Sequence, residues 1–175
     1  ERMTAMSESA RRLTILIADD HPVYRQGLER AIAERPELEL VASSSDGRDA
    51  LERLNELEPD VAVVDGRMPG LDGLKIVAAA KRDGLRTRIM LLTGYEDSAA
   101  AYNALAQGAA GYVSKASDHM ELIESIVTAG RGETVIAPQF AAGIANEIQL
   151  RETSDRPALT GREAEVLTLL AEGRT

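Results

Sequence analysis

The stretch VAVVDGRMPGLDG at residues 61–73 decides the fold, because four apolar residues are followed at once by an aspartate and a turn rich in glycine. A run that is apolar at every position is typical of a strand buried on both faces of a sheet. A second such run, ILIA at residues 15–18, also ends in acidic residues, Asp19 and Asp20. Strands buried on both faces favour a parallel sheet with helices on each side.

Strand patterns and helix patterns alternate around these two runs. The expected strands are Leu13–Ala18, Leu38–Ala42, Val61–Val64, Arg88–Leu92 and Ala110–Val113. The expected helices lie near Val23–Ala33, Gly47–Leu57, Leu74–Lys81, Ser98–Ala106 and Asp118–Ala129. Five successive strand–helix units predict an α/β fold with a doubly wound parallel sheet, because right-handed crossovers place each helix over one face of the sheet.

The composition indicates one main domain and a smaller appendage. The 175 residues, of which 44% are hydrophobic, can bury one full core. The chain has no cysteine, which excludes disulfides and thiolate sites, and it has no apolar run of the roughly 18 residues that a membrane span needs. We therefore expect a soluble, cytoplasmic protein. The net charge of -9 argues against direct binding of nucleic-acid phosphates by this stretch.

The pattern changes after the fifth unit. We expect Arg131–Ala137 to form a loop and a linker helix to begin near Pro138, within a linker that covers residues 133–157. The apolar stripe of this helix either packs back on the main domain or forms an interaction surface, and it consists of Phe140, Ile144 and Ile148. The polar stretch Glu152–Ala158 contains a proline, so we place a domain boundary there.

Five polar side chains follow the predicted strands at the edge where parallel strands end. Asp19 and Asp20 follow the first strand, Asp65 the third, Thr93 the fourth and Lys115 the fifth. Each has an ordinary interpretation by itself, such as a cap of the first helix for the acidic pair or a solvated surface position for the lysine. Functional groups of open parallel sheets collect at this edge, so the shared location favours one common site.

Three carboxylates in one crevice need a positive partner, because each pair repels by up to about 4 kcal/mol at an effective dielectric constant of 20. Mg²⁺ is a suitable ion, since it takes oxygen ligands and typically bridges one or two carboxylates to a phosphate. Lys115 can neutralise a phosphoryl oxygen, and Thr93 can donate a hydrogen bond to another. The set suits phosphoryl transfer to a carboxylate.

Four segments resemble, in order and spacing, the signature segments of response-regulator receiver domains. They are IADDHP at 17–22, VVDGRMPGLDG at 63–73, LLTGYED at 91–97 and GAAGYVSK at 108–115. The resemblance covers about residues 13–132 and implies a flavodoxin-like (βα)5 receiver domain there. DDHP together with LTGREAEVLTLLAEGRT at 159–175 resembles the NarL/FixJ subfamily of two-component response regulators, which carry a LuxR-type helix-turn-helix output domain.

The resemblance implies a metal site built from acidic residues. Asp65 would be the phosphoacceptor and would bind Mg²⁺ together with Asp20 and the backbone carbonyl of Arg67. Asp19 would hold a metal-bound water.

The resemblance also implies a switch beside this site. Lys115 would contact the phosphoryl group, Thr93 would turn inward to bond it, and Tyr112 would move in step. From the residues alone, Tyr112 is equally a half-buried aromatic of a strand. The surface between Ser98 and Ala129 would then report phosphorylation.

A response regulator of this kind would receive its phosphoryl group from a sensor histidine kinase and would regulate transcription. It would catalyse only its own phosphorylation and dephosphorylation, and it would have a homodimer as a possible assembly.

Residues 158–175 would begin the output domain. Thr160 and Glu163 form a capping box before an apolar run, and Gly173 can end the helix. We expect DNA binding through the complete output domain only, because these 175 residues stop before a recognition helix.

Three other classes of protein fit the pattern less well. A haloacid-dehalogenase-like phosphohydrolase needs a second acid where Arg67 stands. A nucleotide- or flavin-binding domain lacks its G-x-G-x-x-G after the first strand. A receiver-only adaptor does not account for LTGREAEVL at 159–167. The two histidines, His21 and His119, have no partner at metal-ligand spacing in the sequence, so we expect both to be structural or surface residues.

Overall fold

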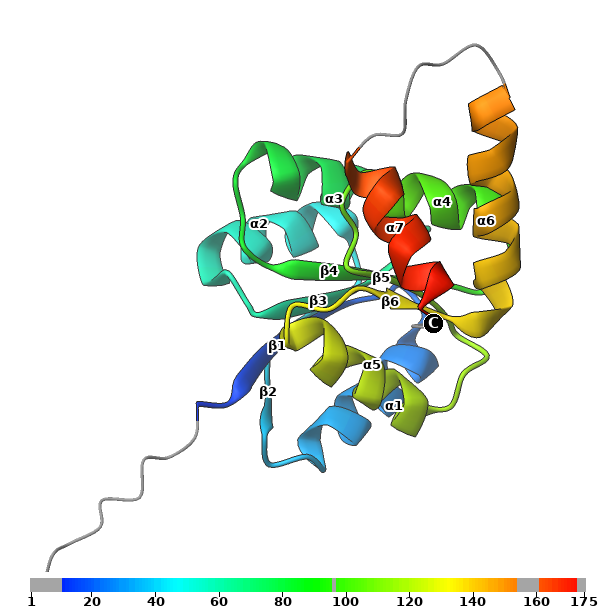
Figure 1. The fold of residues 1–175 in the computed structure, drawn as a ribbon. Coiled ribbons are helices and arrows are strands. Elements are labelled where there is room, and N and C mark those ends of the chain that lie inside the picture. The colour runs from blue at the N-terminus through cyan, green and yellow to red at the C-terminus, as the bar shows by residue number, and fades with distance from the viewer. Residues whose placement is uncertain (1–10, 96, 154–160, 173–175) are drawn as a thin grey trace, which may run out of the picture.

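The computed structural model describes residues 11–95, 97–153 and 161–172. Its centre is a six-stranded parallel sheet with the order β2-β1-β3-β4-β5-β6, covered by helices on both faces (Figure 1). The predicted flavodoxin-like α/β fold is therefore confirmed. The strands are β1 Leu13–Ala18, β2 Leu38–Ser44, β3 Val61–Asp65, β4 Arg88–Thr93, β5 Gly111–Ser114 and β6 Val135–Ile136. The helices are α1 Pro22–Ala33, α2 Gly47–Leu57, α3 Gly73–Arg82, α4 Ser98–Ala106, α5 His119–Gly130, α6 Pro138–Thr153 and α7 Gly161–Ala171.

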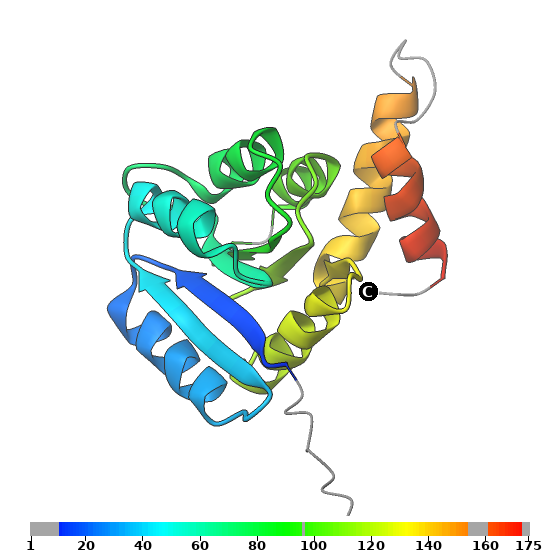
Figure 2. The same ribbon diagram turned by 90° about the vertical axis from the view of Figure 1, so that its left-hand side faces the viewer.

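Alternate residues of the central strands belong to two separate hydrophobic cores. Leu16 and Val64 belong to the core under α2, α3 and α4, whereas Ile17 and Val63 belong to the core under α1 and α5. All four side chains are fully buried. Figure 2 shows the two layers of helices on opposite sides of the strands. Burial on both faces explains why these runs contain no polar residue before the strand ends.

Aspartates begin four of the helices and so fix the loops at the edge of the sheet. The side chains of Asp46, Asp72, Asp97 and Asp118 each accept a hydrogen bond from a backbone N–H in the first turn of the helix that follows. Such caps satisfy N–H groups that have no partner within the helix. The loops that border the strand ends are held in place as a result.

The sixth strand corrects the prediction of a loop over Arg131–Ala137. Val135 and Ile136 pair in parallel with Gly111 and Tyr112 of β5. A strand of two residues is too short to show a period-2 pattern, so its polar flanks dominate the sequence signal.

The apolar stripe of α6 packs on the main domain. Phe140, Ile144 and Ile148 are fully buried in the core that includes α4. Gly143 makes this close approach possible, because a methyl group there would overlap the side chain of Ser98 at the start of α4. Of the two interpretations of the stripe, packing is the one that the structure supports.

Helix α7 packs beside α4 and α6 with Val166 buried (Figure 1). Arg162 anchors its first turn, donating hydrogen bonds to the backbone carbonyls of Leu105 (2.8 Å) and Ala109 (2.7 Å). The capping residue Thr160, the helix-ending Gly173 and most of the predicted boundary at 152–158 lie outside the described residues. Within the described ranges, no helix is long and apolar enough to cross a membrane.

Candidate functional site

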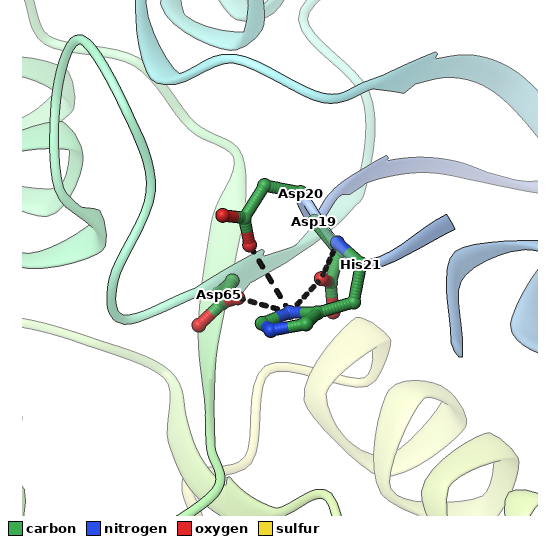
Figure 3. A group of neighbouring side chains, drawn as sticks. All are labelled: Asp19, Asp20, His21 and Asp65. Atoms are coloured by element: carbon green, nitrogen blue, oxygen red, sulfur yellow. Dashed lines mark hydrogen bonds and ion pairs between the residues drawn. The ribbon is translucent and has the colours of Figure 1, made fainter. Parts of the chain in front are cut away.

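Acidic side chains from two neighbouring strands meet at the carboxyl edge of the sheet. Asp19 and Asp20 follow β1, and Asp65 is the last residue of the adjacent β3 (Figure 3). Asp19 and Asp65 are almost fully buried, with side chains 0% and 6% exposed, while Asp20 is partly exposed. The three aspartates that the sequence assigns to one site are therefore side by side. They do not cap the first helix, whose N-cap is His21, with no side-chain cap bond.

Lys115 supplies the positive charge for this group. Its Nζ lies 2.7 Å from Asp19 Oδ2 and 3.0 Å from Asp65 Oδ2, and its side chain is only 15% exposed. Lys115 follows β5, two strands away from β3, so the sheet order brings it to the same edge. One lysine against three carboxylates leaves the group negatively charged.

His21 lies among the carboxylates, contrary to the expectation that it has no partner at metal-ligand spacing. Its Nδ1 is 3.0 Å from Asp19 Oδ1, 3.1 Å from Asp20 Oδ1 and 3.4 Å from Asp65 Oδ2 (Figure 3). The side chain is still 65% exposed, as expected of a surface residue. The indication in the sequence was that His21 directly follows the acidic pair Asp19 and Asp20.

The environment of Asp65 penalises its charge. Burial raises the pKa of the carboxyl group, while the backbone N–H of Arg67, which donates to Oδ1 at 3.0 Å, and the ammonium group of Lys115 act in the opposite direction. The Asp65 carboxylate is costly to ionise because it is buried, yet two donors hold its charged form. Such a group is suited to react or to bind a cation.

Tyr24 and Arg25 border the site from α1, and sequence analysis did not identify either. The ammonium group of Lys115 lies 4.9 Å from the centre of the Tyr24 ring. Burial, with Asp19 and Asp65 nearby, raises the pKa of Tyr24 to about 12. Arg25 donates a hydrogen bond from Nη1 to the carbonyl of Asp19 at 2.7 Å and so fixes the loop after β1.

A divalent cation fits this arrangement. Asp19, Asp20, His21 and Asp65 each offer one ligand atom, and the four atoms lie within 4.8 Å of one another. Asp20 Oδ1 is buried yet has no hydrogen-bond partner among the described residues. A buried carboxylate oxygen without a donor is costly, and a hard cation would satisfy it.

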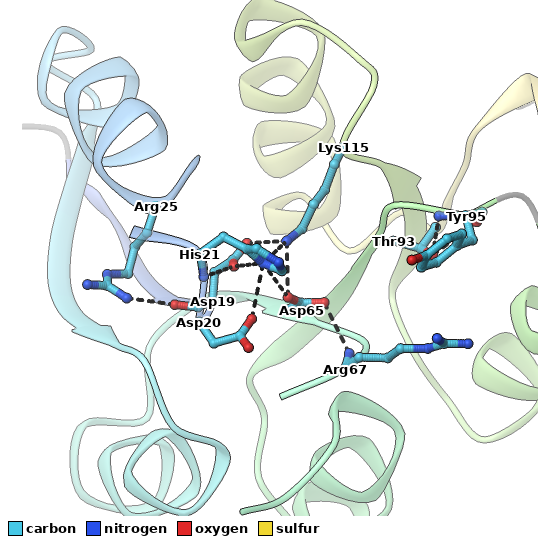
Figure 4. A network of polar contacts seen from close by, with 9 residues as sticks. All are labelled: Asp19, Asp20, His21, Arg25, Asp65, Arg67, Thr93, Tyr95 and Lys115. Atoms are coloured by element: carbon cyan, nitrogen blue, oxygen red, sulfur yellow. Dashed lines mark hydrogen bonds and ion pairs between the residues drawn. The ribbon is translucent and has the colours of Figure 1, made fainter. Parts of the chain in front are cut away.

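A cavity of about 750 Å³ extends from these carboxylates to the end of β4. Thr93 lines it, but its hydroxyl donates to the carbonyl of Tyr95 (3.0 Å) and accepts from the N–H of Tyr95 (3.1 Å). Figure 4 shows Thr93 and Tyr95 apart from the acidic group. The guanidinium group of Arg67 lies 5.1 Å from the centre of the Tyr95 ring, and both residues line this cavity. The structure thus brings Thr93 to the pocket, with its hydroxyl bonded to its own loop.

Tyr112 is buried inside the domain and not half-exposed on the strand. It is 5% exposed, and its ring meets the ring of Phe140 edge-on, with 4.9 Å between the centres. Burial raises the pKa of its hydroxyl, against the effect of the neighbouring Thr93. Tyr112 therefore contacts both Thr93 at the end of β4 and Phe140 of the linker helix α6.

Comparisons with known proteins identify the family and its NarL-type relatives. Residues 15–127 match the family "Response regulator receiver domain". The chain is 37% identical over 164 residues to the "Probable transcriptional regulatory protein NarL" of Mycobacterium tuberculosis, covering 94% of this chain and 76% of that protein. It is 31% identical to the "Nitrate/nitrite response regulator protein NarL" of Escherichia coli, covering 91% and 76%. Among solved structures, a LuxR-family two-component response regulator from Aurantimonas matches with a TM-score of 0.72 and 36% identity, over 78% of this chain and 97% of that one.

Proposed function

The chain belongs to the response-regulator family, as a NarL-type member of the LuxR group with a receiver domain, and from this membership we propose that it accepts a phosphoryl group on Asp65 from a sensor histidine kinase. The observation that carries the proposal is the position of Asp65, buried at the end of β3 and 3.0 Å from Lys115. A nucleophile must be accessible to the phosphoryl donor, and the cavity of about 750 Å³ opens onto Asp65.

The transfer forms one bond and breaks another. An oxygen of the Asp65 carboxylate attacks phosphorus, an O–P bond forms, and the P–N bond to the kinase histidine breaks, so that the imidazole nitrogen leaves with the electron pair. Lys115 is held within reach of the incoming phosphoryl oxygens by Asp19. Catalysis in this reaction is mainly positioning and charge neutralisation, which fixed charges at a buried edge can provide.

Mg²⁺ is the cofactor that we propose for this site. Asp20, Asp65 and the backbone carbonyl of Arg67 would hold it, and Asp19 would hold a bound water. When bound, the ion supplies positive charge that offsets the phosphoryl oxygens and orients them. Asp20 Oδ1, which accepts no hydrogen bond among the described residues, and the net negative charge of the group support this assignment.

Thr93 and Tyr112 are the proposed switch. In the unphosphorylated chain the Thr93 hydroxyl is bonded to the backbone of Tyr95, so a new phosphoryl oxygen must compete with two existing hydrogen bonds. A phosphoryl group carries a charge of about -1.5 to -2 at neutral pH, which makes it the stronger acceptor. Movement of Thr93 would pass to Tyr112 and from there to Phe140 of α6.

The output of this switch would be transcription regulation through the helix-turn-helix domain that begins near residue 158. The relative from Mycobacterium tuberculosis named above is a "Probable transcriptional regulatory protein", which supports this part of the proposal. DNA would be bound by the complete output domain and a homodimer is a possible assembly, while the chain would catalyse only its own phosphorylation and dephosphorylation.

Phosphorylation by a small donor tests the proposal without the kinase. The chain is incubated with acetyl phosphate, with Mg²⁺ or with excess chelator, and followed by intact-mass spectrometry. We expect one phosphoryl group per chain with Mg²⁺ and none with chelator or in Asp65→Asn. The matched control is Asp72→Asn, which changes a capping carboxylate of the loop that leads into α3. Equal labelling of Asp65→Asn and the unmodified sequence would refute the assignment.

A further inference from the structure

We propose that His21 is a ligand of the bound divalent cation and that its ring nitrogen gives this site a preference for transition-metal ions such as Co²⁺ over Mg²⁺. The inference rests on the proposed function only in using the same metal site. It assigns a role to a side chain that the phosphoryl-transfer scheme leaves unused.

The distances from His21 Nδ1 to the three carboxylates match those between neighbouring ligands of one ion. With metal–ligand bonds of about 2.1 Å, neighbouring ligands stand about 3.0 Å apart in an octahedron and about 3.4 Å apart in a tetrahedron. His21 Nδ1 stands 3.0, 3.1 and 3.4 Å from one oxygen each of Asp19, Asp20 and Asp65. An ion bound by Asp20 and Asp65 would therefore have His21 Nδ1 within reach as a further ligand, with Asp19 beside it to hold a bound water (Figure 3).

Lys115 contacts the same ring nitrogen that faces the carboxylates. Its Nζ lies 3.0 Å from His21 Nδ1, and an ammonium group can only donate hydrogen bonds. Nδ1 accepts from Lys115 when it carries a lone pair, which is the form that binds a metal, and donates to Asp19 when it carries a proton. Asp19 and Asp65 give Lys115 two other acceptors, at 2.7 and 3.0 Å, when a cation takes its place beside the ring (Figure 4).

The backbone holds the ring over the site. The N–H of His21 donates to Asp19 Oδ1 at 2.8 Å, and the residue is extended, with φ -94° and ψ 103°. Pro22 restricts the preceding residue to this region, so the extended geometry is imposed locally by the sequence. The side chain is 65% exposed, so part of the ring stays in contact with solvent.

The chemistry of the donor set predicts the preference. Carboxylate oxygens suit Mg²⁺, whereas imidazole suits transition ions, and affinity for a mixed nitrogen and oxygen site rises along the first-row series from Mn²⁺ to Cu²⁺. An added nitrogen ligand should therefore strengthen Co²⁺ binding much more than Mg²⁺ binding. Mg²⁺ can still bind through the oxygens alone.

Metal titration of the tag-free chain tests the proposal, with Co²⁺ and Mg²⁺ as the probes. Isothermal titration calorimetry compares the unmodified sequence with His21→Phe, which keeps the ring and removes both nitrogens, and with His119→Phe, which changes the only other histidine. We expect His21→Phe to lose about tenfold or more in Co²⁺ affinity, and threefold or less in Mg²⁺ affinity, with His119→Phe unchanged. In proton NMR of the Co²⁺ form, a strongly shifted exchangeable imidazole N–H should be present except in His21→Phe.

The outcomes separate this inference from the proposed function. If His21→Phe binds Co²⁺ as tightly as the unmodified sequence while acetyl phosphate still labels Asp65, the ligand role of His21 is wrong and the proposed function stands. If neither ion binds to the unmodified sequence, the ligand role is wrong and the Mg²⁺ part of the proposed function fails with it. Loss of Co²⁺ preference in His21→Phe with labelling of Asp65 retained supports both.

Discussion

Replacing Lys115 by methionine should destabilise the chain strongly when no metal is present. The substitution keeps much of the side-chain volume and removes the ammonium group that lies 2.7 Å from Asp19 Oδ2 and 3.0 Å from Asp65 Oδ2. At an effective dielectric constant of 20, each contact is worth about 6 kcal/mol of Coulomb attraction before desolvation is subtracted. Removing one partner of a buried ion pair typically costs about 3–5 kcal/mol, because the remaining charges stay buried.

Urea unfolding with chelator present measures this loss. We expect Lys115→Met to lower the free energy of unfolding by about 3–5 kcal/mol, which is a large part of the stability of a typical domain. Mg²⁺ should restore part of it, since an ion that binds only the folded state stabilises that state. Lys75→Met, at an exposed position of α3, should change the stability by less than about 0.5 kcal/mol.

The comparison has one decisive outcome. If Lys115→Met and Lys75→Met unfold at the same urea concentration in chelator, Lys115 does not offset the buried carboxylates. The electrostatic account of the site would then be wrong.

Three further changes test neighbouring parts of the structure. Spectrophotometric titration should show a tyrosine that ionises near pH 12 and that is absent in Tyr24→Phe. In the unfolded chain a tyrosine ionises near pH 10. The stability contributed by the protonated Tyr24 phenol is therefore complete below about pH 10 and is lost as the pH rises towards 12. Phe140→Leu should lower the free energy of unfolding by about 1 kcal/mol in urea, because the edge-on contact with Tyr112 is lost, and an unchanged midpoint would contradict that contact. Arg162→Met removes two hydrogen bonds from a charged group, each worth about 1.5–3 kcal/mol, so amide hydrogens of α7 should exchange about tenfold faster or more; equal exchange would place α7 elsewhere.

The sheet and the acidic group could be predicted because their causes are local in the sequence. Strands buried on both faces must be apolar throughout, and parallel strands end at one edge, so Asp19, Asp20 and Asp65 could be placed together without coordinates. The position of Lys115 at this edge could be predicted in the same way, although its two ion pairs could not.

Features that depend on where a side chain points were not predictable in the same way. The ring of His21 reaches three carboxylates because Pro22 and the hydrogen bond to Asp19 fix its backbone, and no pattern in the sequence reports that direction. The hydroxyl of Thr93 is bonded to the backbone of Tyr95, which depends on the local path of one loop. Strand β6 is too short to produce a periodic signal, and its pairing depends on its neighbour β5.

The central claim is that Asp65 is the residue that becomes phosphorylated, and borohydride trapping with peptide mapping tests it most directly. Borohydride reduces an acyl phosphate on aspartate to homoserine, which tandem mass spectrometry locates within a peptide. After treatment with acetyl phosphate and Mg²⁺, we expect homoserine at position 65 and unmodified aspartate at positions 19 and 20. Homoserine at position 19 or 20 with aspartate retained at position 65, or no conversion at any of the three, would contradict the account.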